Sequence, residues 1–251
     1  MTEQIRGVEL HHGAATDVGL VREVNEDSFL AAPPVFVVAD GMGGHESGDV
    51  ASAIVVEEFG RLADEGYDAR RGAEVVAATL GTCQERIAEF GAAHRARGTR
   101  SFYAGTTAVV ALLVEDDEGP KWLLANLGDS RIYRFGDGAT HPERHVITRA
   151  LGGPDRVEAD YFLLPLPSVD RLLLCSDGVT GMIDDATMAE ILGRADDPRD
   201  AADQLVAAAV QAGGRDNATA VVVDVVGLAT ENSYDSERQR VSLEQKLGAL
   251  P

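Results

Sequence analysis

The segment at residues 35–48, V-F-V-V-A-D-G-M-G-G-H-E-S-G, constrains the fold of this chain more than any other. Its opening run of Val and Phe is typical of a buried strand. Asp40 follows that strand, and four of the next eight residues are glycine. A carboxylate at a strand end, beside backbone without side chains, suits the close approach of a hard metal ion. The alternative is a strand–turn–helix corner with a solvated Asp40, because Asp-Gly is a common turn dipeptide.

Three further acidic spots lie where expected strands begin or end. Glu26 and Asp27 close the segment T-D-V-G-L-V-R-E-V-N-E-D, which also contains Arg22. Asp177 follows the apolar run R-L-L-L-C-S, and Asp216 precedes A-T-A-V-V-V. A sheet can direct side chains from several strand ends into one cleft, so we expect these acids to lie together.

Seven segments occur in an order that is specific to one known family. They are T-D-x-G-x-x-R-x-x-N-E-D, V-A-D-G-M-G-G-H, G-T-T (residues 105–107), G-D-S-R-I-Y (128–133), T-R-A-L-G-G (148–153), C-S-D-G and D-N-A-T. On these motifs the chain resembles the PPM family (type 2C) of metal-dependent protein phosphatases, in its bacterial branch. The resemblance extends from Thr16 to about Val226, which is most of the chain.

This resemblance implies a site that binds two divalent ions. Asp40 would bridge both ions, and Gly41 would contribute its backbone carbonyl. Asp177 and Asp216 would complete the shell of the first ion, while Glu26 would bind water molecules on the second. These oxygen ligands suit Mn²⁺ or Mg²⁺, and the chain has no Cys/His cluster for zinc.

Three positions near this expected site have more than one interpretation. Arg22 matches a phosphate clamp, because a guanidinium fork fits two phosphate oxygens; the alternative is a surface ion pair with a neighbouring acid. Asp129 resembles the position that holds a third, weaker ion in bacterial members, and is otherwise a turn residue or a partner of Arg131. Asp27 is either a direct ligand or a supporting turn residue.

The proton donor for the leaving group has two candidates. His45 is the only histidine near the metal motif, and a general acid is needed for phosphate ester hydrolysis. Many eukaryotic relatives carry His two residues after the bridging Asp, where this chain has Met42. The eukaryotic role therefore cannot be transferred to His45, and a metal-bound water is the alternative acid.

Composition disfavours several other classes of function. The chain has 42 acidic and 22 basic residues, a net charge of −20 and no Lys/Arg run, which disfavours nucleic acids and anionic membranes as partners. Cys175 lies in an apolar run and no C-x5-R loop occurs, so a cysteine-based phosphatase is disfavoured. The first residues are polar and the apolar runs are short, so we expect a cytoplasmic monomer that is not inserted in a membrane.

The apolar patterns predict an α+β fold. Strands are expected at residues 9–15, 28–32, 35–39, 106–114, 122–127, 130–135, 171–175 and 218–226, and helices at 50–62, 73–93, 184–193 and 198–212. Strands in blocks and helices in pairs do not match alternating βαβ units. The resemblance refines this to two packed antiparallel sheets flanked by helix pairs, a four-layer α-β-β-α sandwich. Residues 1–227 would form this domain, and residues 228–251 a polar tail that is disordered or forms a short helix near 242–250.

The chain departs from the family pattern at one place. A flap subdomain usually separates the G-D-S-R strand from the T-R-A-L-G segment, but here residues 138–148 make the whole connection. A loop beside a cleft shapes what can enter it. The shortened flap therefore leaves the metal chemistry intact but puts the substrate preference and the third ion in question.

The resemblance implies hydrolysis of phosphoserine and phosphothreonine in proteins by a hydroxide that bridges a binuclear Mn/Mg centre. The substrates would be targets of bacterial Ser/Thr kinases. One alternative is a non-catalytic regulatory or binding module that keeps the fold, which the presence of Asp40, Asp177, Asp216 and Glu26 disfavours. Another is a phosphatase dedicated to one regulatory partner, which the short flap favours and the lack of an appended sensor domain disfavours.

Overall fold

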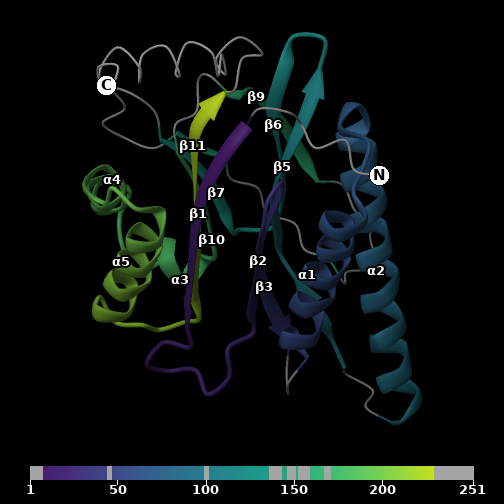
Figure 1. Cartoon of the computed structure of the whole chain (residues 1–251). Helices are drawn as coiled ribbons and strands as arrows, with labels where there is room; N and C mark the ends of the chain where they lie inside the picture. The colour runs from purple at the N-terminus through teal and green to yellow at the C-terminus, as the bar shows by residue number, and fades with distance from the viewer. Residues whose placement is uncertain are drawn as a thin grey trace, which may run out of the picture.

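The computed structural model describes residues 8–43, 47–98, 102–135, 143–145, 151, 159–166 and 171–228. These residues form two antiparallel sheets packed face to face, with a helix pair on each outer face (Figure 1). This arrangement confirms the predicted α+β sandwich. No helix in these ranges is both long enough and apolar enough to span a membrane.

Five strands form the first sheet, in the order β1-β11-β10-β7-β8. Their bounds are β1 Val8–Asp17, β11 Ala218–Leu228, β10 Arg171–Cys175, β7 Arg131–Phe135 and β8 Glu143–His145. The second sheet has the order β2-β3-β5-β6-β9, with β4 paired to β3. Its bounds are β2 Asp27–Ala32, β3 Val35–Gly43, β4 Ala104–Thr106, β5 Ala108–Asp116, β6 Gly119–Leu127 and β9 Asp160–Pro165.

Two helix pairs cover the outer faces of the sheets (Figure 1). Helices α1 (Gly48–Glu65) and α2 (Gly72–Ala96) pack on the second sheet, joined by a short 3₁₀ helix, η1 (Ala69–Arg71). Helices α4 (Asp185–Arg194) and α5 (Pro198–Gln211) pack on the first sheet. A single turn of helix, α3 (Asp177–Thr180), follows β10 directly.

The central strand β3 shows why its sequence specifies this layering. Val35, Val37 and Ala39 face the α1–α2 layer, whereas Phe36 and Val38 face the first sheet. All five side chains are fully buried. A strand buried on both faces needs a continuous apolar run rather than an alternating one, since successive side chains point to opposite faces. The run V-F-V-V-A meets this requirement.

The structure differs from the predicted elements in a few places. The strand expected at residues 106–114 is divided between β4 and β5, because Thr107 bonds to the backbone of Asp40 instead of continuing the ladder. Strands β8 and β9 and helix α3 were not predicted. Apart from Leu228, the end of β11, the predicted tail at 228–251 lies outside the described residues. Of the connection at 138–148, only β8 is described.

Candidate metal centre

The strand ends that carry or adjoin the predicted acidic residues lie at one end of the sandwich (Figure 1). Asp27, the first residue of β2, lies directly opposite Asp40 in β3. Asp177 begins α3, with only Ser176 between it and β10, and Asp216 lies two residues before β11. The second sheet therefore contributes Asp27 and Asp40, and the first sheet contributes Asp177 and Asp216.

The pKa values show that these carboxylates act on one another. Burial raises the pKa of Asp40 to about 9, and the charges of Asp27, Asp177, Asp129 and Asp216 add to this rise. Burial also raises the pKa of Asp177, followed by the charges of Asp129 and Asp216. A buried carboxylate surrounded by like charges is stabilised by a bound cation.

The donor set fits a hard divalent ion that keeps part of its water shell. Within the described residues, no three His, Cys, Asp or Glu side chains form a ready-made cluster for one ion. Carboxylate pairs would therefore need backbone carbonyl oxygens and water to complete a shell, which Mg²⁺ and Mn²⁺ accept. Oδ1 of Asp27 is buried without a hydrogen-bond partner, so it is available to a cation or to a water bound to one.

Two of the sequence motifs fix the backbone of Asp40. The N–H of Asp40 donates to Oγ1 of Thr107 at 2.9 Å, and its carbonyl accepts from Oγ1 of Thr106 and the N–H of Thr107, each at 2.9 Å. Thr107 also shares a 2.7 Å hydrogen bond with Ser130 of the G-D-S-R motif. The G-T-T and G-D-S-R segments are thus explained by the need to hold Asp40 in place.

Glu26 and two glycines form a close contact at the start of α1. Oε1 of Glu26 accepts from the N–H of Gly48 at 3.1 Å, at the helix N-terminus, where an acidic side chain is favoured. A Cβ on Gly41 would lie 2.2 Å from the carbonyl oxygen of Gly48 and 2.5 Å from that of Glu26. The glycines are therefore required by close approach, and Glu26 is positioned beside Gly41.

Arg22 makes an ion pair with one of the predicted metal ligands. Its Nη2 donates to Oδ2 of Asp216 at 2.7 Å, and the two side chains are 49% and 36% exposed. This hydrogen bond is the main cause that raises the pKa of Arg22. Arg22 therefore forms the predicted surface ion pair, and this ion pair places it beside the carboxylates, where a phosphate clamp would have to lie.

Asp129 lies at the exposed margin of this group, close enough to raise the pKa of Asp40 and Asp177. Arg131 instead reaches Tyr133, whose hydroxyl oxygen accepts from its Nη1 at 3.1 Å. His45 lies outside the described residues. The structure therefore brings together Asp40, Asp177, Asp216, Asp129 and Arg22, with Glu26 beside Gly41.

The comparisons with known proteins agree with this geometry. A family model described as protein phosphatase 2C matches residues 21–207, most of the chain. The chain belongs to the protein phosphatase 2C family. The predicted family is thereby confirmed, and with it the prediction that the chain is a phosphatase enzyme.

Individual members of the protein phosphatase 2C family show the same likeness. "Serine/threonine phosphatase stp" of Listeria innocua is 32% identical over 246 residues, covering 86% of this chain and 96% of the relative. Among solved structures, the catalytic domain of serine/threonine protein phosphatase PstP, in complex with two manganese ions, is 31% identical with a TM-score of 0.72. The alignment covers 87% of this chain and 99% of the PstP chain. PppA of Pseudomonas aeruginosa is 30% identical with a TM-score of 0.74, covering 88% and 100%.

Sequence reasoning did not single out the polar residues that connect the two sheets at this protein phosphatase 2C site. Oγ of Ser176 donates to Oδ2 of Asp27 at 2.7 Å and accepts from the N–H of Thr219 at 3.0 Å. Asn217 bonds to the loop that carries Arg22. Their only signal was membership of the C-S-D-G and D-N-A-T motifs, in which the aspartates attract attention first.

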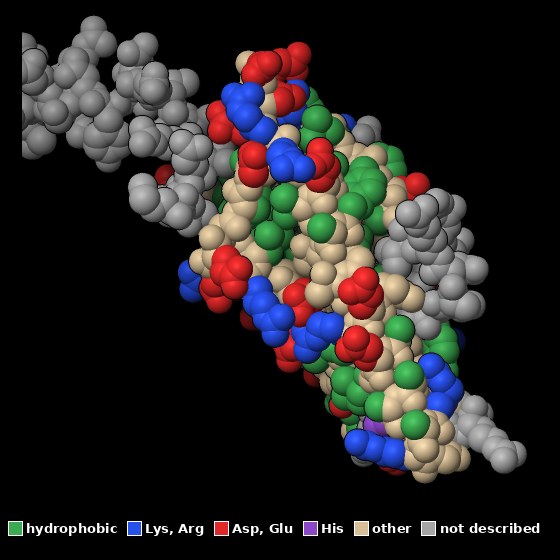
Figure 2. Space-filling model, turned by 90° about the vertical axis from the view of Figure 1, so that its right-hand side faces the viewer, with side chains coloured by type: hydrophobic (Ala, Val, Ile, Leu, Met, Phe, Trp, Pro, Cys, Tyr) green, Lys and Arg blue, Asp and Glu red, His purple; other side chains and the backbone are tan. Residues whose placement is uncertain are grey.

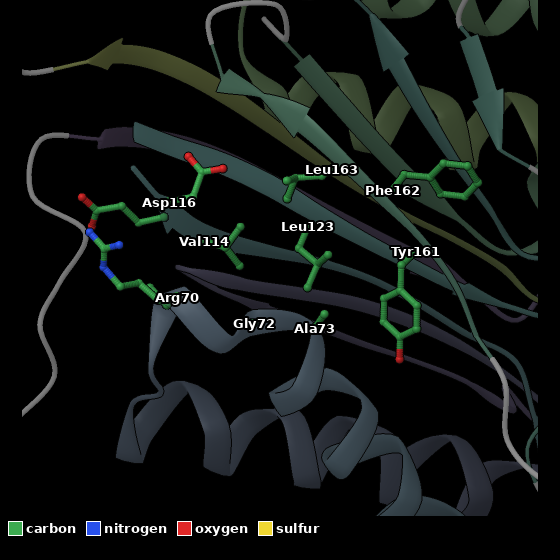
Figure 3. A pocket seen from close by; sticks show the side chains of 11 residues that line it. Arg70, Gly72, Ala73, Val114, Asp116, Leu123, Tyr161, Phe162 and Leu163 are labelled. Atoms are coloured by element: carbon green, nitrogen blue, oxygen red, sulfur yellow. The ribbon is translucent and has the colours of Figure 1, made fainter. Parts of the chain in front are cut away.

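A hollow lies away from the carboxylates. It has a volume of about 320 Å³ and lies between η1, the start of α2 and strand β9 (Figure 3). Val114, Leu123 and Leu163 line its apolar part, and Arg70 and Asp116 lie at its margin. Figure 2 shows the side of the molecule where α1 and α2 lie, with apolar side chains gathered below a cap of charged ones. None of the predicted site residues lines this hollow.

Proposed function

We propose that this chain hydrolyses phosphoserine and phosphothreonine in proteins, with water activated at two divalent ions. The convergence of the carboxylates around Asp40 supports this best, because a buried group of like charges is stable only with cations or protons. When bound, the ions supply Lewis-acid activation of water and offset the charge of the phosphoryl group. The PstP catalytic domain, with its two manganese ions, supports the choice of metal.

The residues of this chain divide the work at the proposed site. Asp40 would contact both ions, and Asp177, Asp216 and the carbonyl of Gly41 would complete the set that holds them. Glu26 would orient water through the carboxylate oxygen opposite the one that bonds to Gly48. Asp129, at the exposed margin, is the candidate ligand for a third ion.

Arg22 would bind the non-bridging oxygens of the substrate phosphate. It lies beside Asp216 and is half exposed, so its guanidinium can reach a ligand that enters from solvent. An exposed ion pair of this kind contributes little stability, so replacing the carboxylate of Asp216 by a substrate phosphate as the partner of Arg22 should cost little free energy. For the proton that the leaving oxygen needs, His45 and a water molecule both remain candidates.

The partners of the site are proposed from the relatives. The connection at residues 138–148 is short, which leaves little length for a flap subdomain beside the site. We propose that this widens access and leaves selection to the site margin. Substrates of bacterial Ser/Thr kinases, a cytoplasmic location and a monomeric state remain predictions.

Phosphate release from a phosphothreonine peptide tests the proposal. Activity should disappear in excess chelator and return with Mn²⁺ more fully than with Ca²⁺, because Ca²⁺ prefers longer and more numerous oxygen bonds. The control is thermal melting of the same samples, which shows that the metal-free protein is folded. Full turnover of an aryl phosphate by the chelated protein would exclude the metal mechanism, and no turnover with any metal would favour the binding-module alternative.

Replacing Arg22 with alanine should raise the KM for a phosphopeptide strongly. Loss of a charge-assisted, two-pronged contact should cost roughly 2–4 kcal/mol in kcat/KM. Arg22→Lys should recover only part of this, because an ammonium lacks the fork. Titration calorimetry with Mn²⁺ should show little change in affinity, since the carboxylates remain.

Arg131→Ala is the matched control for the Arg22 variant. Arg131 contacts Tyr133, so its loss should lower the melting temperature rather than raise KM. An Arg22→Ala enzyme with the kinetics of the parent would reduce Arg22 to a surface ion-pair residue.

A further inference from the structure

The side chain of Asn217 makes three hydrogen bonds to one loop of the site. Asn217 is 5% exposed. Its Nδ2 donates to the carbonyls of Val18 and Val24, each at 3.0 Å, and its Oδ1 accepts from the N–H of Glu26 at 2.9 Å. One buried amide thus closes the loop at residues 18–26 by binding both of its ends. This loop carries Arg22 at its centre and Glu26 at its end.

The Glu26 end of this loop is also held by hydrogen bonds from Gly41, Gly48 and Ser52, but its middle has few contacts. The N–H of Leu20 donates to the carbonyl of Gly214 at 2.7 Å, and Arg22 pairs with Asp216. Leu20 is 70% exposed and Val21 is 66% exposed, so apolar burial contributes little to the position of the loop. A segment with few buried contacts opens readily unless hydrogen bonds hold it.

Asn217 also lies next to a proposed ion ligand. Its backbone N–H donates to Oδ1 of Asp216 at 2.9 Å, so the same two residues orient a carboxylate and fix the loop. Its carbonyl approaches Gly178 so closely that a Cβ there would lie 1.8 Å from the oxygen. The backbone of Asn217 therefore contacts Asp216 and Gly178, while its side chain bonds to the loop at residues 18–26.

We propose that Asn217 is a positioning residue that keeps the middle of the loop, and with it Arg22, in register with the carboxylates. Only an amide meets all three contacts, because it presents two N–H donors and an acceptor on one planar group. Alanine loses all three bonds. Aspartate keeps the acceptor but sets a carboxylate oxygen against two carbonyls. The kinetic part of this proposal rests on the proposed role of Arg22, whereas the effect on the loop does not.

Limited digestion with trypsin tests the structural part without substrate or metal. Trypsin cleaves after arginine, and the bond between Arg22 and Glu23 lies in the middle of the loop. We expect Asn217→Ala to be cut there at least ten-fold faster than the parent. The matched control is Asn126→Ala, which removes another buried amide, 1% exposed, whose Nδ2 donates to the carbonyl of Ser130 instead.

Two comparisons separate opening of the loop from general unfolding. Cleavage after Arg171, which is 8% exposed in the middle of a sheet, reports global unfolding and should not be accelerated to the same degree. Hydrogen exchange at the amides of residues 18–26 should rise in Asn217→Ala and not in Asn126→Ala. Equal cleavage of the loop in the two variants, or loop cleavage that only follows cleavage after Arg171, would overturn the proposal.

A double-mutant cycle tests the kinetic part. If Asn217 acts through Arg22, Asn217→Ala should raise the KM for a phosphopeptide at least ten-fold in the parent but less than two-fold in an Arg22→Ala background. Independent, multiplying effects would show that Asn217 does not act through Arg22. If the parent releases no phosphate, the proposed function fails, and digestion and hydrogen exchange still decide the role of Asn217 in the loop.

Discussion

Replacing Asp40 with asparagine should abolish turnover while the fold survives. The change keeps the shape of the side chain but removes the charge that the two ions would share, and we expect a loss of about 10³-fold or more, roughly 4 kcal/mol. Phosphate release at saturating Mn²⁺ measures the loss, and calorimetric titration measures the weakened metal binding. Asp64→Asn, at the exposed far end of α1, is the control that changes charge alone. Unchanged turnover would remove Asp40 from the mechanism.

The same variant should be more stable than the parent in chelator. Burial and neighbouring acids raise the pKa of Asp40 from 3.8 to about 9 in the fold. The folded state therefore holds this proton more tightly than the unfolded chain, and stability falls as pH rises between these two values. Asparagine removes this dependence. Its advantage in melting temperature should be small near pH 4 and grow toward pH 9, and the opposite trend would contradict the assignment of a buried, crowded carboxylate.

Loss of Arg171 should destabilise the fold severely. Arg171 is 8% exposed, and its Nε and Nη2 donate to the two oxygens of Asp224 at 2.6 and 2.8 Å. Its Nη1 donates to the carbonyls of Leu192 and, at 2.7 Å, Ala195, at the end of α4. Alanine would leave the largely buried carboxylate of Asp224 and two carbonyls without partners, so Arg171→Ala should cost about 3–5 kcal/mol. Urea unfolding of the metal-free protein measures this.

Two further variants show whether the buried pair is the cause. Arg194→Ala removes an exposed arginine from the same helix end, where the pair with Glu190 is open to solvent, and should change the free energy of unfolding by less than about 0.5 kcal/mol. Arg171→Met combined with Asp224→Leu should recover only part of the loss. The double variant leaves no unpaired carboxylate, but the carbonyls of Leu192 and Ala195 still lack a hydrogen-bond donor. Equal effects of Arg171→Ala and Arg194→Ala would contradict the structure.

The sequence predicted the strands that are buried on both faces better than the others. V-F-V-V-A in β3 is a continuous apolar run that only a central strand explains, and its position was predicted closely. Strand β9 was missed, because D-Y-F-L-L-P has a proline at its end and alternates between half-buried and exposed positions. Strand β8 has three residues, too few for any period.

The candidate site was predictable where a motif contains the chemistry itself. Asp40, Asp177 and Asp216 were named because carboxylates at strand ends suggest ligands, and the structure places them together. The ion pair between Arg22 and Asp216 joins residues 194 positions apart. Asn217 bonds to a loop almost as distant. Such contacts follow from how the two sheets pack, and no local pattern encodes that packing.

Because the site is divided between the two sheets, we expect catalysis only when the two sheets are packed against each other. Asp40 lies in the sheet covered by α1, and Glu26 immediately precedes a strand of that sheet. Asp177 and Asp216 flank strands of the sheet covered by α5. Neither half contains the complete set of proposed ligands, so a partly folded chain with only one formed sheet should not bind the ions. Added Mn²⁺ should therefore bind only when the two sheets are packed together, and it should shift the folding equilibrium toward that state. In a cell, the metal supply would then help to set how much of the chain is folded as well as how fast it works.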